Sequence, residues 1–149
     1  MRIYADPSFL VSLLFARDRG HATARAAFLA QGAAEWLTSQ WSLFETYNSL
    51  RQLCLRTAGP RPEVPEALRR YSKHLHVAGK FTQVDTDMTE ALHECQQIST
   101  AHGSTLRMRS ADVLHVALLE QLQPDLFITR DDDQHALAQA RAFRSLLVP

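Results

Sequence analysis

The chain has 149 residues, of which 46% are hydrophobic and 21% are charged, and its formal net charge is +0. This length is enough to bury a real core, so we expect residues 1–149 to form a single domain. The balanced charge excludes a strong overall attraction to nucleic acid or to anionic lipid, although a local basic patch remains compatible with either partner.

The cysteines and one short apolar run bear on the cellular compartment. Cys54 and Cys95 are the only cysteines, and their number and spacing indicate neither a disulfide framework nor a CxxC metal-binding pair. The apolar run at residues 9–16 is too short to span a bilayer, and it lacks the basic lead and the small-residue cleavage site of a signal peptide. We therefore expect a cytoplasmic protein that does not enter a membrane.

Short β-leaning segments alternate with helical patterns along the whole chain. The apolar or alternating runs predict strands at residues 2–5, 35–38, 81–85, 126–129 and 146–148. The intervening periodicity predicts helices at residues 7–15, 19–31, 41–56, 63–78, 86–102, 110–122 and 133–143, with a loop at residues 57–62. This alternation favours an α/β fold in which a parallel sheet is covered on both faces.

Acidic residues recur at one position in this scheme, the start of a helix that follows a strand or a loop. They are Asp6, Glu45, Asp112 and the run 131–133. Each also has a purely structural interpretation. Asp6 can cap a helix, and Asp112 can favour a helix dipole. Glu45 can complete a capping box with Ser42, and the run 131–133 can form a solvated turn.

Two helical wheels separate these acidic residues further. Glu45 projects away from the predicted apolar stripe of its helix, as a solvated residue would; that stripe comprises Leu43, Tyr47, Leu50 and Cys54. Asp112, in contrast, lies within an apolar face. A buried carboxylate is costly unless it is paired, hydrogen-bonded or protonated. A bound metal ion would offset that cost for Asp112, and an arginine such as Arg107 or Arg109 is the structural alternative.

The predicted topology brings these acidic residues to one edge of the sheet, where the strands end and where ligands bind in open α/β folds. Several carboxylates gathered there repel one another unless a hard divalent ion holds them together. Mg²⁺ takes one or two carboxylates, several waters and phosphate oxygens of a substrate. Such a site supports phosphodiester hydrolysis, because the ion activates water and stabilises the charge that develops on phosphate.

Four segments resemble, in order, the motifs of PIN-domain ribonucleases. They are residues 4–11, 44–50, 110–117 and 127–131, and they contain Asp6, Glu45, Asp112 and Asp131 respectively. The order and spread of the motifs match from residue 3 to residue 148. The set most closely resembles the VapC-type toxins of bacterial toxin–antitoxin pairs. Pro7, where Thr or Ser is more usual, and the triple Asp depart from the commonest pattern.

The resemblance implies a three-layer α/β/α sandwich around a parallel sheet of about four to five strands, often as a homodimer. It implies a metal-dependent endoribonuclease with an RNA substrate. It also implies a small antitoxin partner whose C-terminal segment occupies the active-site groove. The resemblance implies a Mg²⁺ or Mn²⁺ site made by Asp6, Glu45, Asp112 and Asp131. Asp133 would be a further ligand or an alternative to Asp131. Ser8 and Thr129 would support the site through hydrogen bonds or water.

Basic residues and one histidine adjoin these positions. Arg51, Arg109 and Arg130 are candidates for contact with RNA, although a solvated surface position is the commoner outcome for arginine. His115 follows Asp112 by one helical turn, and we expect it to line the site or the core rather than to bind a metal.

Two other functions are compatible with the fold. A PIN-like domain can serve as a binding module without catalysis, although such a module has no need of four clustered carboxylates. An aspartate-based phosphatase or phosphoryl-transfer protein is less consistent with the residues. A haloacid-dehalogenase-like enzyme needs an Asp where this chain has Ser8, and both it and receiver domains rely on a late lysine, whereas no lysine follows Lys80.

Overall fold

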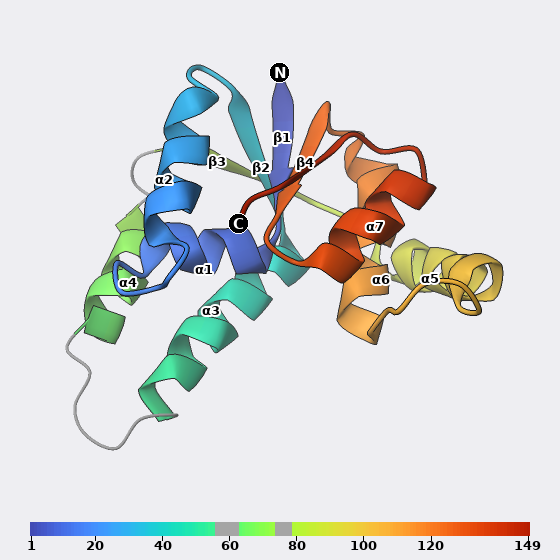
Figure 1. The fold of residues 1–149 in the computed structure, drawn as a ribbon, viewed down its shortest axis with the longest axis horizontal. Helices are drawn as coiled ribbons and strands as arrows, with labels where there is room; N and C mark the ends of the chain where they lie inside the picture. The colour runs from blue at the N-terminus through green and yellow to red at the C-terminus, as the bar shows by residue number, and fades with distance from the viewer. Residues whose placement is uncertain (56–62, 74–78) are drawn as a thin grey trace.

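A computed structural model describes residues 1–55, 63–73 and 79–149, and within them five strands alternate with seven helices (Figure 1). The strands are β1 (Arg2–Ala5), β2 (Glu35–Ser39), β3 (Phe81–Val84), β4 (Leu126–Thr129) and β5 (Ser145–Leu147). The helices are α1 (Pro7–Leu14), α2 (His21–Ala30), α3 (Gln40–Leu55), α4 (Glu63–Ser72), α5 (Met88–His102), α6 (Ser110–Leu122) and α7 (Asp132–Ala140).

The strands form one sheet in the order β3-β2-β1-β4-β5, and every pairing is parallel. Strand β1 is therefore central. Its residue Tyr4 pairs with Leu37 on one side and with Phe127 on the other. The central position of β1 places the residue that follows it, Asp6, in the middle of the carboxyl edge of the sheet.

Alternation along β1 explains why helices cover both faces of this sheet. Ile3 and Ala5 belong to a buried cluster that includes residues of α1 and α2. Tyr4 points to the opposite face, where it joins a cluster formed mainly by α5, α6 and α7. A shift of register by one residue would exchange the two faces of the strand. Because all three side chains are fully buried, their packing fixes the register. The predicted α/β/α sandwich with a parallel sheet is confirmed.

Local capping explains most of the differences at helix ends. The expected helix at residues 86–102 begins two residues later, because the Asp87 side chain accepts the N–H groups of Thr89 and Glu90. The expected helix at residues 133–143 begins one residue earlier at Asp132, and it ends at Ala140, shortly before Ala142 adopts a φ of 62°. The remaining described ends agree with the expected ones to within two residues. The expected loop at residues 57–62 and the expected helical residues 74–78 lie outside the described part.

The predicted apolar stripe of α3 is only partly correct. Leu43 and Leu50 are buried, whereas the side chain of Tyr47 is 45% exposed and packs beside the Tyr71 ring of α4. Tyr47 therefore lies at the border of the buried face rather than within it. Among the described residues, no helix has both the length and the apolar content that crossing a bilayer requires.

Candidate functional site

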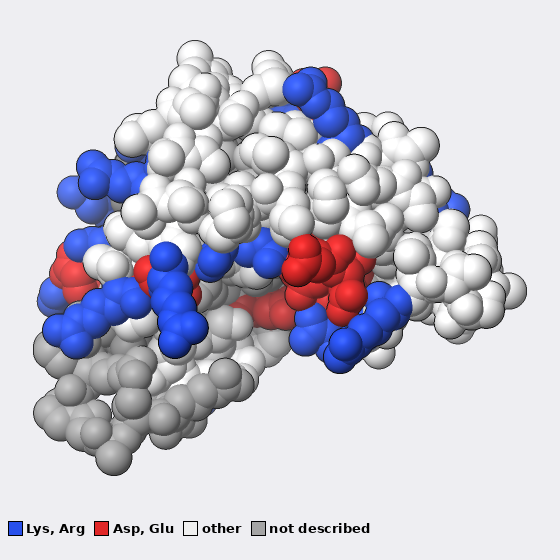
Figure 2. Space-filling view, in the orientation of Figure 1, with Lys and Arg blue, Asp and Glu red and all other residues white. Residues whose placement is uncertain are grey.

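A cleft of about 520 Å³ lies at the carboxyl edge of the sheet. Residues that follow β1 and β4, together with residues of α3 and α6, form its walls. Figure 2 shows acidic side chains gathered beside a hollow on this face, with basic side chains on both sides of them. The four principal candidates from the sequence all line this cleft: Asp6, Glu45, Asp112 and Asp131.

Asp6 is both a helix cap and a buried charge. Its Oδ1 atom accepts the backbone N–H of Phe9 at 3.0 Å and the hydroxyl of Ser8 at 2.8 Å, which fixes the first turn of α1. Its Oδ2 atom is buried and has no hydrogen-bond partner among the described residues. Burial raises the pKa of this carboxyl. The cap alone therefore leaves one oxygen of Asp6 unexplained.

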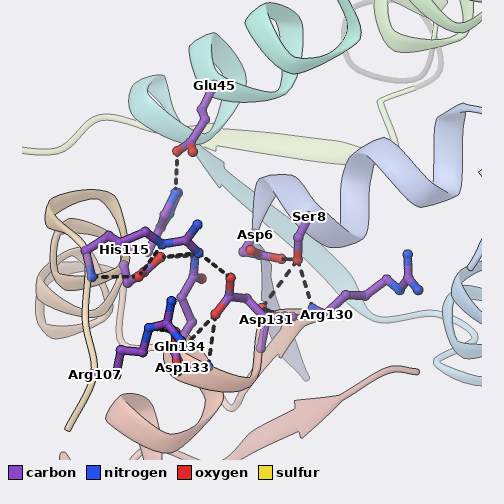
Figure 3. A network of polar contacts seen from close by, with 12 residues as sticks. Asp6, Ser8, Glu45, Arg107, His115, Arg130, Asp131, Asp133 and Gln134 are labelled. Atoms are coloured by element: carbon purple, nitrogen blue, oxygen red, sulfur yellow. Dashed lines mark hydrogen bonds and ion pairs between the residues drawn. The ribbon is translucent and has the colours of Figure 1, made fainter. Parts of the chain in front are cut away.

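Ser8 and Thr129 join the start of α1 to the end of β4. Ser8 Oγ accepts the backbone N–H of Arg130 at 2.9 Å and lies 3.4 Å from Thr129 Oγ1. Thr129 Oγ1 in turn accepts the backbone N–H of Asp131 at 2.9 Å. Both hydroxyls thus hold the backbone beside an acidic residue, and Figure 3 shows the contacts of Ser8 with Asp6 and with the segment at Arg130.

Asp112 is buried, and an arginine accompanies it. Its Oδ2 atom accepts the backbone N–H of Arg109 at 2.8 Å and the Nε–H of the same residue at 3.2 Å. Gln134 of α7 donates its amide to Oδ1 at 3.3 Å. The hydrogen bond with Asp112 also raises the pKa of the Arg109 guanidinium. Arg109, rather than Arg107, is therefore the cation that offsets the burial of Asp112.

Asp131 and Asp133 differ in what they contact. Asp131 caps α7 by accepting the N–H groups of Asp133 and Gln134 on Oδ1, and its Oδ2 accepts Arg109 Nη2 at 2.7 Å. Asp133 faces Arg107 at 3.9 Å and is not among the residues that line the cleft. Oxygen atoms of Asp112, Asp131 and Asp133 nevertheless all lie within 4.8 Å of one another.

Glu45 does not form the capping box that its spacing allows. Helix α3 begins at Gln40, and the N–H of Ser42 is taken by Ser39 Oγ at 3.1 Å, so Ser42 lies inside the helix. The Glu45 side chain instead reaches His115 on α6, whose Nε2 lies 2.8 Å from Glu45 Oε2. The Glu45 side chain is 30% exposed and turned toward the cleft, so it is not a freely solvated residue.

The donor set at the cleft is suited to a hard divalent cation, because it consists of carboxylate oxygens without a thiolate or an available imidazole. The buried Oδ2 of Asp6 is the strongest single indication, since it has no partner among the described residues and a bound cation would supply one. Within the described residues, the three-carboxylate group that could share one ion is Asp112, Asp131 and Asp133. Asp6 and Glu45 line the same cleft outside that group.

The three arginines proposed to contact RNA occupy different environments. Arg109 lies between Asp112 and Asp131 with 68% of its side chain exposed. Arg130 lines the other side of the cleft, where its guanidinium contacts Ser12 and pairs with Asp18 at 2.8 Å. Arg51 is exposed on α3 and does not line the cleft. Two of the three are therefore cleft residues that are already engaged with carboxylates.

Among the cleft residues that sequence reasoning missed, Gln134 and Asp18 form hydrogen bonds with other residues of the site. Gln134 is buried and donates to Asp112, and Asp18 accepts Ser12, Gly20 and Arg130 at the cleft wall. Asp18 carried a usable signal, because the pattern Asp-Arg-Gly directly before a helix is typical of a turn. Gln134 carried none, since its partner is 22 residues away and follows only from the packing of α7 on α6.

Comparison with known proteins gives matches at the level of the family and of the fold. A family model described as PIN domain matches residues 3–140. No curated protein matches this chain. Among solved structures, VapC20 of Mycobacterium tuberculosis, described as a toxin that cleaves the sarcin-ricin loop, is 19% identical with a TM-score of 0.71, and 99% of each chain is covered.

Two further solved structures have the same fold. A chain of VapBC2 from Rickettsia felis, bound to a DNA fragment from its promoter, is 9% identical with a TM-score of 0.66, and 100% of each chain is covered. FitAcB from Neisseria gonorrhoeae is 14% identical with a TM-score of 0.59, and the match covers 97% of this chain and 96% of that one. At these identities the likeness establishes a shared fold.

Proposed function

This chain belongs to the PIN domain family, and on that premise we propose that it is a metal-dependent endoribonuclease and the toxin of a toxin–antitoxin pair. One observation carries the enzymatic part. Four carboxylates from four separate segments line one cleft, and one of them, Asp6, holds a buried oxygen without a partner among the described residues. Such an arrangement is costly for the fold alone and useful for binding a cation.

The proposed ion is Mg²⁺ or Mn²⁺, held by Asp6, Glu45, Asp112 and Asp131, with Asp133 as a further ligand or as the alternative to Asp131. When bound, it supplies an activated water and stabilises charge on the scissile phosphate. The chain contributes the orientation of these carboxylates. Ser8 holds Asp6 through Oδ1, which leaves Oδ2 available for the ion, and Thr129 holds the backbone of Asp131.

Cationic side chains at the cleft suit a polyanionic substrate. Arg109 and Arg130 flank the acidic residues from opposite sides, and we propose that they, with Arg51 on α3, contact the phosphate backbone of RNA. VapC20, which has the same fold, is described as cleaving the sarcin-ricin loop. The proposed partner is a small antitoxin and the proposed assembly is a homodimer, as the resemblance to VapC-type toxins implies. The proposed location is the cytoplasm, which the cysteine usage favours.

Cleavage of a panel of single-stranded and structured RNAs by the purified protein tests the enzymatic proposal. We expect cleavage with Mg²⁺ or Mn²⁺ and none with excess chelator. The double variant Asp6→Ala/Asp112→Ala should be inactive, whereas Asp132→Ala should retain full activity, because Asp132 is exposed and does not line the cleft. Cleavage by the double variant at the rate of the native chain would refute the proposal, and RNA binding without cleavage would favour the binding-module alternative.

The toxin role needs a separate test in cells. Induced expression should arrest bacterial growth, and expression of the Asp6→Ala/Asp112→Ala variant should not. Co-expression of the small protein encoded beside the gene should restore growth. Normal growth on induction of the native chain, with the protein confirmed by immunoblot and active in vitro, would contradict the toxin role and leave the nuclease activity intact.

A further inference from the structure

His115 is a fully buried histidine that connects three of the elements around the cleft. It lies on α6, one turn after Asp112. Its Nδ1 lies 3.0 Å from the hydroxyl of Tyr4 on β1, and its Nε2 lies 2.8 Å from Oε2 of Glu45 on α3. Figure 3 shows the Glu45 carboxylate directed at this ring. Because both ring nitrogens are engaged, His115 has no lone pair left for a metal ion.

The contact with Glu45 determines which nitrogen carries a proton. A carboxylate is only an acceptor when ionised, so a bare Nε2 at 2.8 Å from Oε2 would place two acceptors against each other. Nε2 must therefore carry a proton and donate it to Glu45. In the neutral ring this leaves Nδ1 without a proton, so Nδ1 accepts a hydrogen bond when Tyr4 donates its own proton in that direction.

The residues behind Tyr4 supply that direction. Ser39 Oγ accepts the backbone N–H of Ser42 at 3.1 Å and lies 3.1 Å from the Tyr4 hydroxyl. Burial raises the pKa of Tyr4, so its hydroxyl keeps its proton. With Ser39 donating to Tyr4 and Tyr4 donating to His115, each proton of the chain has one acceptor, and the chain ends on Glu45. The opposite polarity leaves the Ser39 hydroxyl proton without an acceptor among the described residues.

We propose that His115 is a positioning residue for Glu45: its Nε2–H, oriented through Tyr4 and Ser39, holds Oε2 and so presents the other carboxylate oxygen to the cleft. The inference rests on the proposed function, because Glu45 is there a ligand of the divalent ion. A glutamate side chain has several rotamers, and restricting them in advance lowers the entropy that ion binding costs. Partners that orient a ligand in this way typically change metal affinity or activity by about 10–100-fold.

Substitutions of His115 separate the hydrogen bond from simple filling of space. His115→Leu fills the site but donates nothing, whereas His115→Gln restores an N–H near the place of Nε2. We expect His115→Leu to weaken Mn²⁺ binding by about tenfold or more and to lower kcat with little change in KM for RNA. We expect His115→Gln to recover most of the Mn²⁺ affinity. His135→Gln is the matched control, because His135 is a half-buried histidine of α7 that contacts Ser145 outside the cleft.

A spectroscopic measurement tests the tautomer without reference to catalysis. In ¹⁵N-edited spectra of the metal-free protein, the imidazole signals that disappear in His115→Gln should show a protonated Nε2 and an unprotonated, hydrogen-bonded Nδ1. Tyr4→Phe should remove the Nδ1 hydrogen-bond shift and should weaken Mn²⁺ binding in the same direction as His115→Leu, by a smaller factor. A protonated Nδ1 with a bare Nε2 in the native chain would overturn the inference.

The outcomes for His115 and for the proposed function are distinguishable. If the native chain binds Mn²⁺ and cleaves RNA while folded His115→Gln, His115→Leu and Tyr4→Phe match it in affinity and kcat, the positioning role is wrong and the nuclease stands. If the native chain neither binds Mn²⁺ nor cleaves RNA, the nuclease proposal fails, and the role of His115 fails with it. If His115→Leu does not fold, His115→Gln and Tyr4→Phe decide, and equal affinity in Tyr4→Phe and the native chain counts against the role.

Discussion

The Nη2 atom of Arg109 lies 2.7 Å from Oδ2 of Asp131. The same guanidinium also contacts the buried carboxylate of Asp112 through Nε, so one cationic side chain lies between two carboxylates of the cleft. These carboxylates are also among the proposed metal ligands. Arg109 and a divalent ion therefore offer alternative ways to neutralise the same oxygens, and the fold does not need the ion in order to bury Asp112.

Removal of Arg109 should make the protein depend on the ion for stability. In Arg109→Ala, Asp112 keeps its burial but loses its cationic partner, which should lower the free energy of unfolding of the metal-free protein by about 1–3 kcal/mol. Added Mn²⁺ should then raise Tm more in the variant than in the native chain, because it replaces the lost charge. Arg144→Ala is the control, since Arg144 is exposed and does not line the cleft. An equal rise in Tm on addition of Mn²⁺ to Arg109→Ala and to the native chain would contradict this prediction.

Substitution of Asp6 should stabilise the metal-free protein at neutral pH. Asp6→Asn keeps the Oδ1 acceptor for Phe9 and Ser8, and it removes a buried charge whose Oδ2 has no partner among the described residues. We expect a gain of about 1–3 kcal/mol in the free energy of unfolding with chelator present. With Mn²⁺ the order should reverse, because only the native chain then gains from binding the ion.

The same substitution has a pH dependence with a defined sign. Burial raises the folded-state pKa of Asp6 above its unfolded value, so the folded protein binds this proton more tightly. The stability of the native chain therefore falls as pH rises from the unfolded-state pKa of Asp6 to its folded-state pKa. The stability advantage of Asp6→Asn should shrink as pH is lowered through the same range. Urea unfolding at several pH values in chelator measures this, with the exposed Asp132→Asn as control. An advantage that grows toward low pH would show that the sign is wrong.

The position of the Arg130 side chain should require a glycine at residue 20. A Cβ added to Gly20 would overlap the Arg130 guanidinium, which is held by Ser12 and by Asp18. In Gly20→Ala the arginine must leave these partners, and we expect a loss of about 1–2 kcal/mol in the free energy of unfolding. In an Arg130→Ala background the same change should cost much less. A double-mutant cycle by chemical unfolding measures the coupling, and additive effects would rule out this contact as the cause.

The hydroxyl of Thr129 should matter more than its volume. Thr129→Val is nearly isosteric in a fully buried place, but it leaves the partly buried backbone N–H of Asp131 without its acceptor. We expect Thr129→Val to lower stability by about 1–3 kcal/mol and to weaken Mn²⁺ binding, whereas Thr129→Ser should preserve both more nearly. Calorimetric titration with Mn²⁺ and thermal unfolding compare the two variants. A larger loss in Thr129→Ser than in Thr129→Val would point to the methyl group instead.

The sequence by itself determined the features that depend on near neighbours. The short apolar run predicted a strand at residues 2–5, and the strand–helix order implied a parallel sheet. The order of the motifs also placed Asp6, Glu45 and the later acidic residues at one edge, because parallel strands end on the same side. These inferences succeed because strand alternation and helix capping act over only a few residues.

Only the tertiary structure decided which partner each acidic side chain has. Asp112 had two open interpretations in the sequence, and the cation beside it proved to be Arg109, which also reaches across 22 residues to Asp131. Glu45 was compatible with a capping box, yet it contacts His115, 70 residues away. Such pairs follow from how α3, α6 and α7 pack around the end of the sheet. The periodicity of a sequence does not predict which side chains of such distant segments are in contact. The sequence therefore identifies the charges, and the packing of the helices determines how they are neutralised.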